Sequence, residues 1–301
     1  MSIQGKPMRF LLLCAFSLLA ACQTHSVTPP PAPIAPQGRD HADLGVIREL
    51  ASGRTLTPQE LVERLAVAPR VLVGEQHDNP DHHALQLWLL RELAAQRAQG
   101  SLLMEMLNPD QQAKVDAAQA ATRAGQPPAD AFKALAWQAN WDWSVYGALV
   151  TYALRQPYPL LAANLDRAQI MQIYRQRPEL KGEASTTRQV QATLLDDIRQ
   201  SHCGLLPESQ MPAMLAVQQQ RDRRMAERLM ASPTPALLLA GAFHVRKDLG
   251  VPLHLKDLGA GEGNAVLILA EAGKTVTAES ADYVWYTAAQ PEQDHCAKLR
   301  R

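Results

Sequence analysis

Four short apolar runs, separated by longer stretches of helical periodicity, dominate the pattern of this chain. None of the runs alternates with polar side chains, which is typical of strands that are covered on both faces. The runs lie at residues 71–74, 102–104, 159–163 and 236–241. Between the first two, residues 81–99 have the helical spacing of Leu85, Trp88, Leu89 and Leu93. This alternation predicts an α/β fold with a mainly parallel β-sheet flanked by helices.

The intervals between the runs are unequal. Residues 166–233 are helical in pattern and are interrupted by Pro178 and Pro207, so we expect about three helices in a smaller subdomain inserted between two core strands. Residues 108–152 form a second helical stretch, which closes with the aromatic side chains Trp137, Trp141, Trp143 and Tyr146. Two later runs, at 265–269 and 283–286, predict further strands near the edge of the sheet.

Polar side chains follow each of the four strongest predicted strands. They are Glu75, His77, Glu105, Asn164 and His244. Because the carboxyl ends of parallel strands meet at one edge of a sheet, we expect these five residues to converge on one site. The first and fourth strands both end in Gly-x-x-His, at Gly74 and Gly241, and a glycine lets backbone or ligand approach closely.

The residue types at this edge permit two kinds of chemistry. Two imidazoles and two carboxylates, from His77, His244, Glu75 and Glu105, can ligate a divalent transition metal. They can equally act as general acid and base, with Glu75 and Glu105 as catalytic carboxylates. His-Glu-x-x-His and a serine nucleophile elbow are absent from the sequence, so the familiar zinc-protease and serine-hydrolase signatures do not apply.

Several nearby residues have both a structural and a functional interpretation. Of His82 and His83, one turn into the next helix, we expect one to face the site and the other to face solvent. Arg221 either forms a surface or interhelical pair or steers an anionic group at the site. The aromatic group of residues 137–146 either packs a core or forms a wall for a flat apolar ligand.

The N-terminus predicts export and lipidation. Lys6 and Arg9 precede an apolar run at 10–19, which is too short to span a bilayer and suits a signal peptide. The run ends in Leu19-Ala20-Ala21-Cys22, which is typical of a bacterial lipobox, so residues 1–21 are expected to be removed and Cys22 to carry the lipid anchor. Residues 22–42, which are rich in proline, are expected to form a semi-rigid tether, and residues 43–301 the folded domain.

The cysteine count predicts a disulfide, and the charge balance argues against a nucleic-acid partner. Cys14 leaves with the signal and Cys22 is acylated, so Cys203 and Cys296 remain for a disulfide in an oxidising compartment. The alternatives are two free thiols or a metal site. Two of the 30 basic residues leave with the signal, so the mature chain has 28 basic and 30 acidic side chains. Such a balance lacks the basic footprint of nucleic-acid binding, and we expect no nucleic-acid partner.

The order of these motifs resembles the ChaN-like haem-binding lipoproteins from about Leu56 to Cys296. The similar segments are Gly74-Glu75-Gln76-His77-Asp78-Asn79-Pro80-Asp81-His82-His83, Met104-Glu105-Met106, Ala163-Asn164, Gln219-Gln220-Arg221-Asp222 and Gly241-Ala242-Phe243-His244-Val245. The family is similar in turn to the Tiki metalloproteases and to erythromycin-esterase-like proteins, which share paired Gly-x-x-His signatures.

The resemblance implies a haem-binding protein of iron acquisition rather than an enzyme. It implies haem as the cofactor, enclosed within a homodimer, and a haem uptake system as partner. A lipobox followed by the non-acidic Gln23 implies the outer membrane of a Gram-negative bacterium. The implied iron ligand is a tyrosine assisted by a histidine, with Tyr146 and Tyr174 as candidates. The full set expected to contact haem is His77, His83, Tyr146, Asn164, Tyr174, Arg221 and His244.

A metal-dependent hydrolase of the Tiki or esterase kind is the alternative. In that case Glu75, His77, Glu105 and His244 would surround a metal-activated water.

Overall fold

The computed structural model describes residues 1–2, 26–294 and 296–297. Apart from its first two residues, the predicted signal peptide lies outside the described residues, as does Cys22. Within the described residues, none of the helices combines the length and the apolarity that crossing a membrane would need.

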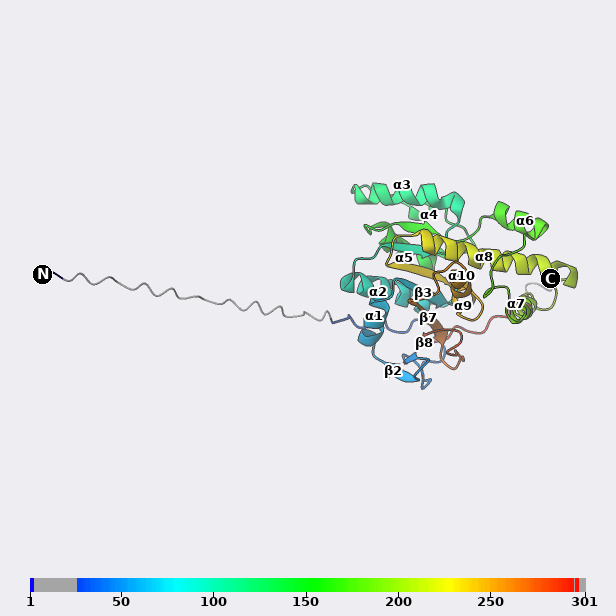
Figure 1. Cartoon of the computed structure of the whole chain (residues 1–301), viewed down its shortest axis with the longest axis horizontal. Helices are drawn as coiled ribbons and strands as arrows, with labels where there is room; N and C mark the ends of the chain where they lie inside the picture. Colours follow the sequence, from blue (N-terminus) through cyan, green and yellow to red (C-terminus); the bar gives the residue numbers. More distant parts are fainter. Residues whose placement is uncertain (3–25, 295, 298–301) are drawn as a thin grey trace.

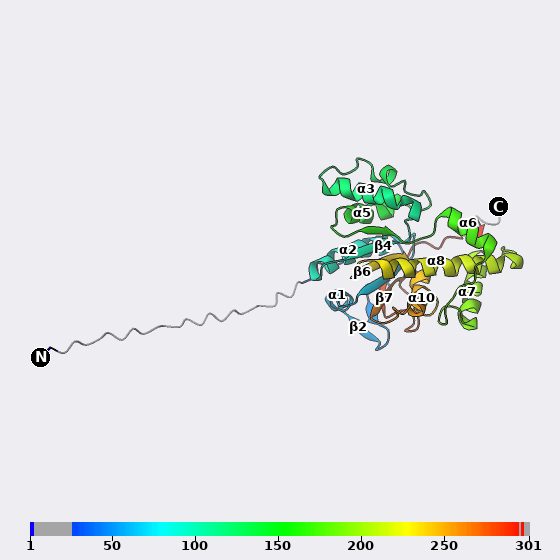
Figure 2. The same ribbon diagram turned by 45° about the horizontal axis from the view of Figure 1, so that its top comes forward.

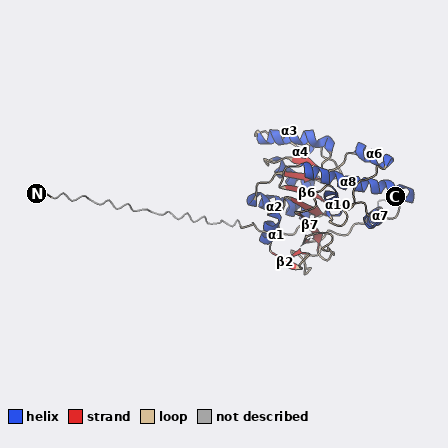
Figure 3. Ribbon diagram, viewed as in Figure 1, coloured by secondary structure: helices blue, strands red, loops and turns tan. Residues whose placement is uncertain are grey.

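The described strands form one eight-stranded sheet in the order β2-β1-β8-β7-β3-β6-β4-β5 (Figures 1 and 3). Six strands pair in parallel: β3 (Arg70–Glu75), β4 (Ser101–Met104), β5 (Leu160–Ala162), β6 (Ala236–Gly241), β7 (Asn264–Glu271) and β8 (Tyr283–Thr287). β1 (Ile47–Glu49) and β2 (Arg54–Leu56) add an antiparallel pair beside β8. The predicted α/β class with a mainly parallel sheet is confirmed.

The predicted edge position of the last two strands is wrong. β7 lies between β8 and β3, and seven of its eight residues are buried, because helices cover both of its faces. The edge beyond β8 is built by β1 and β2 instead. Each has three residues, which is too short a run to show a strand period in the sequence.

Helices cover both faces of the sheet, and alternate residues of each strand face opposite layers. Val71 and Val73 of β3 pack in one layer and Leu72 in the other. The first layer contains α1 (Pro58–Ala66), α2 (Pro80–Gln96), α3 (Gln112–Arg123), α4 (Ala131–Ala134) and α5 (Trp143–Leu154), with the short 3-10 helix η1 (Pro109–Gln111) before α3. The second contains α8 (Met211–Ala231), α9 (Ala242–Val245) and α10 (Val251–Asp257).

Residues 166–233 contain α6 (Arg167–Gln176), α7 (Arg188–Ser201), the 3-10 helix η2 (Glu208–Gln210) and α8. Figures 1 and 2 place α6 and α7 beside α8, at the opposite end of the molecule from α1. The segment does not have an independent core, because Met225 and Leu229 of α8 pack against the sheet. Asp257 of α10 ties down the loop before α7 by accepting the backbone N–H groups of Glu183, Ala184 and Ser185.

The proline-rich segment is docked on the domain, so residues 27–37 do not act as the predicted tether. The Val27 N–H donates to Gln59 of α1 at 2.8 Å, and the Trp88 indole donates to the Thr28 carbonyl at 3.0 Å. Ala35 is fully buried, and Gln37 forms a bridge with Ala289. An extended proline-rich backbone leaves its polar groups without internal partners, and here the side chains of α1 and α2 supply them.

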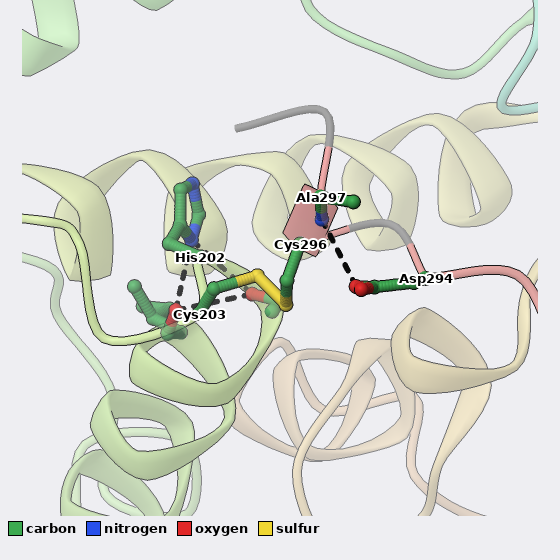
Figure 4. The surroundings of a disulfide bond; sticks show 7 residues. His202, Cys203, Asp294, Cys296 and Ala297 are labelled. Atoms are coloured by element: carbon green, nitrogen blue, oxygen red, sulfur yellow. Dashed lines mark hydrogen bonds between the residues drawn. A yellow bond between two sulfur atoms is a disulfide. The ribbon is translucent and has the colours of Figure 1, made fainter. Parts of the chain in front are cut away.

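The predicted disulfide is confirmed: Cys203, just after α7, is bonded to Cys296 (Figure 4). The two Cα atoms lie 5.7 Å apart. Before reaching Cys296 the chain leaves β8 and its Gln290 N–H donates to Glu271 at the end of β7. The bond therefore ties the last described segment to the α7 side of the molecule.

Candidate functional site

The parallel register brings the strand ends together, as the sequence led us to expect. Glu75 lies opposite Gly241 in the β3–β6 pair, and the backbone N–H of Glu105 donates to Leu239 of β6. Both Gly-x-x-His glycines sit where a side chain would collide. A Cβ on Gly74 would lie 2.5 Å from Val245, and a Cβ on Gly241 would lie 2.8 Å from Nε2 of His77. The glycines thus allow β3, β6 and the imidazole to approach.

Glu75 is a buried carboxylate with four partners. One oxygen accepts from His77 Nδ1 at 2.9 Å and from the Tyr146 hydroxyl. The other accepts from Gln86 at 2.6 Å and lies 3.1 Å from His83 Nδ1. Burial by itself would raise the pKa of Glu75, but the charges and hydrogen bonds of His83 and His77 outweigh it and lower that pKa. Glu75 is therefore ionised and orients the residues around it.

His77 is the exposed member of the cluster. Its side chain is 40% exposed, and its ring packs edge-on against Trp141 with the centroids 4.8 Å apart. Burial lowers the pKa of His77, whereas the hydrogen bond to Glu75 and the charge of Glu105 raise it, and the net shift is upward. Since Nδ1 is directed at Glu75, Nε2 is the ring nitrogen left to meet a ligand; it lies 4.0 Å from Glu105.

A second histidine–carboxylate group lies behind the first. Nδ1 of the buried His244 is hydrogen-bonded to Asp222 of α8, and its Nε2 lies 3.3 Å from Glu105. Burial lowers the pKa of His244, but Glu105 and Asp222 together raise it to about 10. Glu105 also accepts the Gly241 N–H at 2.8 Å, and despite burial its pKa is lowered, chiefly by His244. His244 is thus an imidazolium that lies between the carboxylates of Glu105 and Asp222.

Both histidines of α2 are buried, so the prediction that one of them faces solvent is wrong. Nδ1 of His82 accepts the Gln76 N–H at 2.8 Å, and Nε2 lies 3.0 Å from the Thr287 hydroxyl. Burial lowers the pKa of His82 to about 3, so this ring is a neutral link between β3 and β8. His83 instead reaches the site through its contact with Glu75.

The remaining predicted residues differ in how close they come to this cluster. Asn164 donates to the backbone carbonyl of Glu105 at 3.0 Å and so supports the end of β4. The half-buried Arg221 contributes to the lowered pKa of Glu105. Tyr146 is only 1% exposed and its hydroxyl donates to Glu75, whereas no described hydrogen bond or ring contact joins Tyr174 of α6 to the cluster.

Gln86 was not predicted as a site residue, and Asp222 was named only beside Arg221, without a role of its own. Neither follows a strand: each projects from a helix, so only the packing of α2 and α8 on the sheet brings it to a strand end. The Gln-Arg-Asp sequence of α8 marked the region but did not distinguish Arg221 from Asp222.

Three open pockets meet at His77, and two of them are large. One has a volume of about 550 Å³ and is lined by apolar side chains, including Phe243 and Ile268. The other, of about 540 Å³, has a wall made by Trp141 and Tyr146. Such volumes suit a cofactor-sized ligand. Trp137 is buried in the core, so the core-packing interpretation holds for it, whereas Trp141 lines the second pocket.

The ionisable side chains of the cluster are mostly directed at one another. Within the described residues no three histidine, cysteine, aspartate or glutamate side chains are grouped to hold a metal, because each imidazole of the cluster is directed at a carboxylate. Phe243 is 63% exposed and lines the same pocket as His77. Since Nδ1 of His77 is directed at Glu75, its Nε2 is the ring nitrogen that can meet a ligand in that pocket.

Comparison with known proteins agrees with this geometry. Residues 61–255 match the family described as haem-binding uptake, Tiki superfamily, ChaN. The structure of ChaN of Campylobacter jejuni, described as cofacial haem binding, is 30% identical, with a TM-score of 0.73 over 81% of this chain and 97% of that one. No curated protein matches the chain.

More distant structures share less of the fold. A mutant of the erythromycin esterase EreC is 11% identical with a TM-score of 0.47, covering 84% of this chain and 86% of that one. A toxin effector domain from Vibrio vulnificus is 13% identical with a TM-score of 0.42, covering 82% and 41%. The family match and the Campylobacter jejuni structure together show that the chain belongs to the ChaN family of haem-binding uptake proteins in the Tiki superfamily.

Proposed function

We propose that the protein binds haem at the carboxyl-end edge of the sheet, with His77 facing the iron, and serves haem or iron acquisition. The observation that supports this most directly is the exposed imidazole of His77, which Glu75 holds in place beside the apolar pocket of Phe243. Haem supplies an iron centre that takes an axial donor and a macrocycle that needs apolar cover. The cofacial binding described for ChaN of Campylobacter jejuni supports a homodimer around haem.

Tyr146 is better suited to positioning Glu75 than to holding iron. Its pKa is raised by burial and by the charge of Glu75, so the phenol stays protonated and remains a donor to that carboxylate. An iron-bound tyrosinate would have to leave Glu75 and become exposed. We therefore assign the iron-facing position to His77, and place Tyr146 behind it.

Titration of the mature chain without its lipidated Cys22, residues 23–301, with haemin is expected to give a saturable Soret shift. His77→Ala should weaken haemin binding at least tenfold, because it removes the exposed donor, while His41→Ala, which replaces an exposed histidine outside both pockets of the site, should not. Size-exclusion chromatography of the same samples reports whether haem assembles a dimer. If no saturable shift occurs at micromolar protein, the proposal is wrong.

We also propose that Cys22 anchors the protein to the outer membrane. The positive n-region, the apolar run and the four lipobox positions support this. Because Val27 is already docked on α1, only four residues separate Cys22 from the folded domain, and the domain would lie close to the lipid surface. Labelled palmitate should enter the wild-type protein and not Cys22→Ser; equal labelling of both would contradict the assignment.

One observation favours a second candidate, an acid–base hydrolase. His77–Glu75 and His244–Asp222 are two imidazoles, each held by a carboxylate, on either side of Glu105. Such pairs position a general base. Hydrolysis of simple aryl or lactone esters that His77→Gln abolishes would support this candidate, with metal analysis of the native protein showing whether zinc, manganese or cobalt takes part. Ester turnover that the variant retains would reject it.

A further inference from the structure

We infer that Lys274 is the residue that binds the carboxylate groups of the porphyrin, and so sets which way round the ligand enters the pocket beside Phe243. The inference rests on the proposed haem function. It concerns the pocket of about 550 Å³, whose lining includes the end of β7, Gly241 of β6 and both acidic and basic side chains.

The acidic side chains of this pocket are already hydrogen-bonded to other residues of the protein. Glu75 is held by His77, His83, Gln86 and Tyr146, as described above. Glu271 accepts from Gln76 and Asn79 at 3.2 Å each and from the Gln290 N–H at 2.8 Å. Neither carboxylate forms an ion pair with Lys274, and Oε1 of Glu271 is held by three donors.

The two cations of this pocket differ in whether a carboxylate already binds them. Arg246 is bound by Asp248 through two nitrogens, at 3.0 and 2.6 Å. Lys274 has no carboxylate within ion-pairing distance among the described residues, and its side chain is exposed. The free positive charge of the described pocket lining is thus the ammonium of Lys274.

The backbone places Lys274 just beyond the end of β7, in the exposed part of the pocket lining. β7 ends at Glu271, and the Lys274 N–H donates back to the Glu271 carbonyl at 3.0 Å, closing a turn in which Gly273 has a φ of +88°. A residue with a Cβ is strained at that φ, so the glycine makes the tight turn possible. The turn carries the exposed Lys274 past the end of the strand, where it lines the pocket.

An amphipathic ligand matches this arrangement of charge and apolar surface. The faces of a porphyrin are apolar and suit Phe243 and Ile268, and its two carboxylates lie on one edge, which suits a single exposed cation of the lining. With Lys274 in the exposed part of the lining, the acidic edge points outward and the apolar edge enters first. The same chemistry applies to metal-free porphyrin, because the contact does not involve iron.

The test compares three ligands on the mature chain: haemin, metal-free protoporphyrin IX and protoporphyrin IX dimethyl ester. Lys274→Gln is expected to weaken binding of the first two about fivefold, since an exposed ion pair is modest, and to leave the ester unchanged. Lys274→Glu should weaken the two acids more than tenfold through repulsion. Lys114→Gln, an exposed lysine of α3 outside the pocket, is the matched control and should change none of them.

The outcomes distinguish failure of the role of Lys274 from failure of the proposed haem function. If the wild type binds both acids and Lys274→Gln binds them equally well, the inference is overturned and the haem function stands. If Lys274→Gln loses the ester as well, the residue shapes the pocket rather than pairing with carboxylates, and the inference again fails. If the wild type binds none of the three ligands, the proposed function fails and the inference with it. Quenching of porphyrin fluorescence gives a readout that is independent of iron.

Discussion

Removing the Cys203–Cys296 disulfide is expected to lower the free energy of unfolding by about 4–5 kcal/mol. The bond joins residues 93 apart in sequence, and closing a loop of roughly 100 residues costs the unfolded chain entropy equivalent to about 4.7 kcal/mol. Urea unfolding at 25 °C, with and without a phosphine reductant, measures the difference. It can be repeated on the double variant Cys203→Ser, Cys296→Ser.

The double variant is also the control for the reductant, which should have no further effect on it. A loss below 1 kcal/mol on reduction would contradict the expectation and would mean that the unfolded chain keeps these segments close together without the bond. Gln290 and Gln293 of the segment that ends at Cys296 line the pocket of Trp141. Hydrogen exchange of this segment should therefore rise on reduction, while exchange of β3 should not.

Asp222→Asn is expected to lower the free energy of unfolding by roughly 3 kcal/mol at pH 7, because it leaves the buried imidazolium of His244 with Glu105 as its one anionic partner. The substitution keeps the size of the side chain, so packing of α8 is retained. Urea unfolding measures the loss. Asp196→Asn, an exposed carboxylate on α7, is the control and should cost little.

The pH dependence of the same variant tests the cause. His244 has a pKa of about 10 in the folded protein, above its ordinary 6.5, so the folded state binds this proton more tightly than the unfolded state. The resulting stability is fully present below about pH 6.5 and is lost as the pH rises through about 10. Asp222→Asn should flatten this decline. An identical slope in both proteins would refute the assigned charge state.

His82 affects the stability of the folded protein in a separate pH range. The pKa of His82 is lowered to about 3, so its contribution is present above pH 6.5 and is lost as the pH falls toward 3. The two effects therefore divide near pH 6.5. The pKa values of His77 and His83 are also raised, so the share of His244 in the alkaline limb is the difference between the wild type and Asp222→Asn.

The strand ends could be predicted because their signal is local. A run of apolar residues closed by glycine and a polar side chain, such as residues 71–77, shows both the strand and its end in adjacent positions. Parallel pairing then places Glu75, Glu105 and His244 at one edge without further information. The disulfide was equally predictable, since only Cys203 and Cys296 remained after Cys14 and Cys22 had been assigned to the signal peptide and the lipid anchor.

The partners of those residues could not be predicted in this way. Asp222 contacts His244 across 22 positions, and Tyr146 contacts Glu75 across 71. Their approach depends on how α8 and α5 pack on the sheet. The docking of residues 27–37 escaped prediction for a related reason: proline favours an extended backbone whether or not a surface lies beneath it.

The sequence by itself determined the chain order of the strands from β3 to β8, the residues at the ends of four of them and the family, because these are carried by short motifs in fixed order. Only the tertiary structure decided what each strand-end residue can do. Glu75 and Glu105 are ionised and His244 carries a proton, because each is buried against a partner from a distant element. His77 alone of these four remains exposed, because Gly241 leaves room for its ring where any larger residue would fill the space.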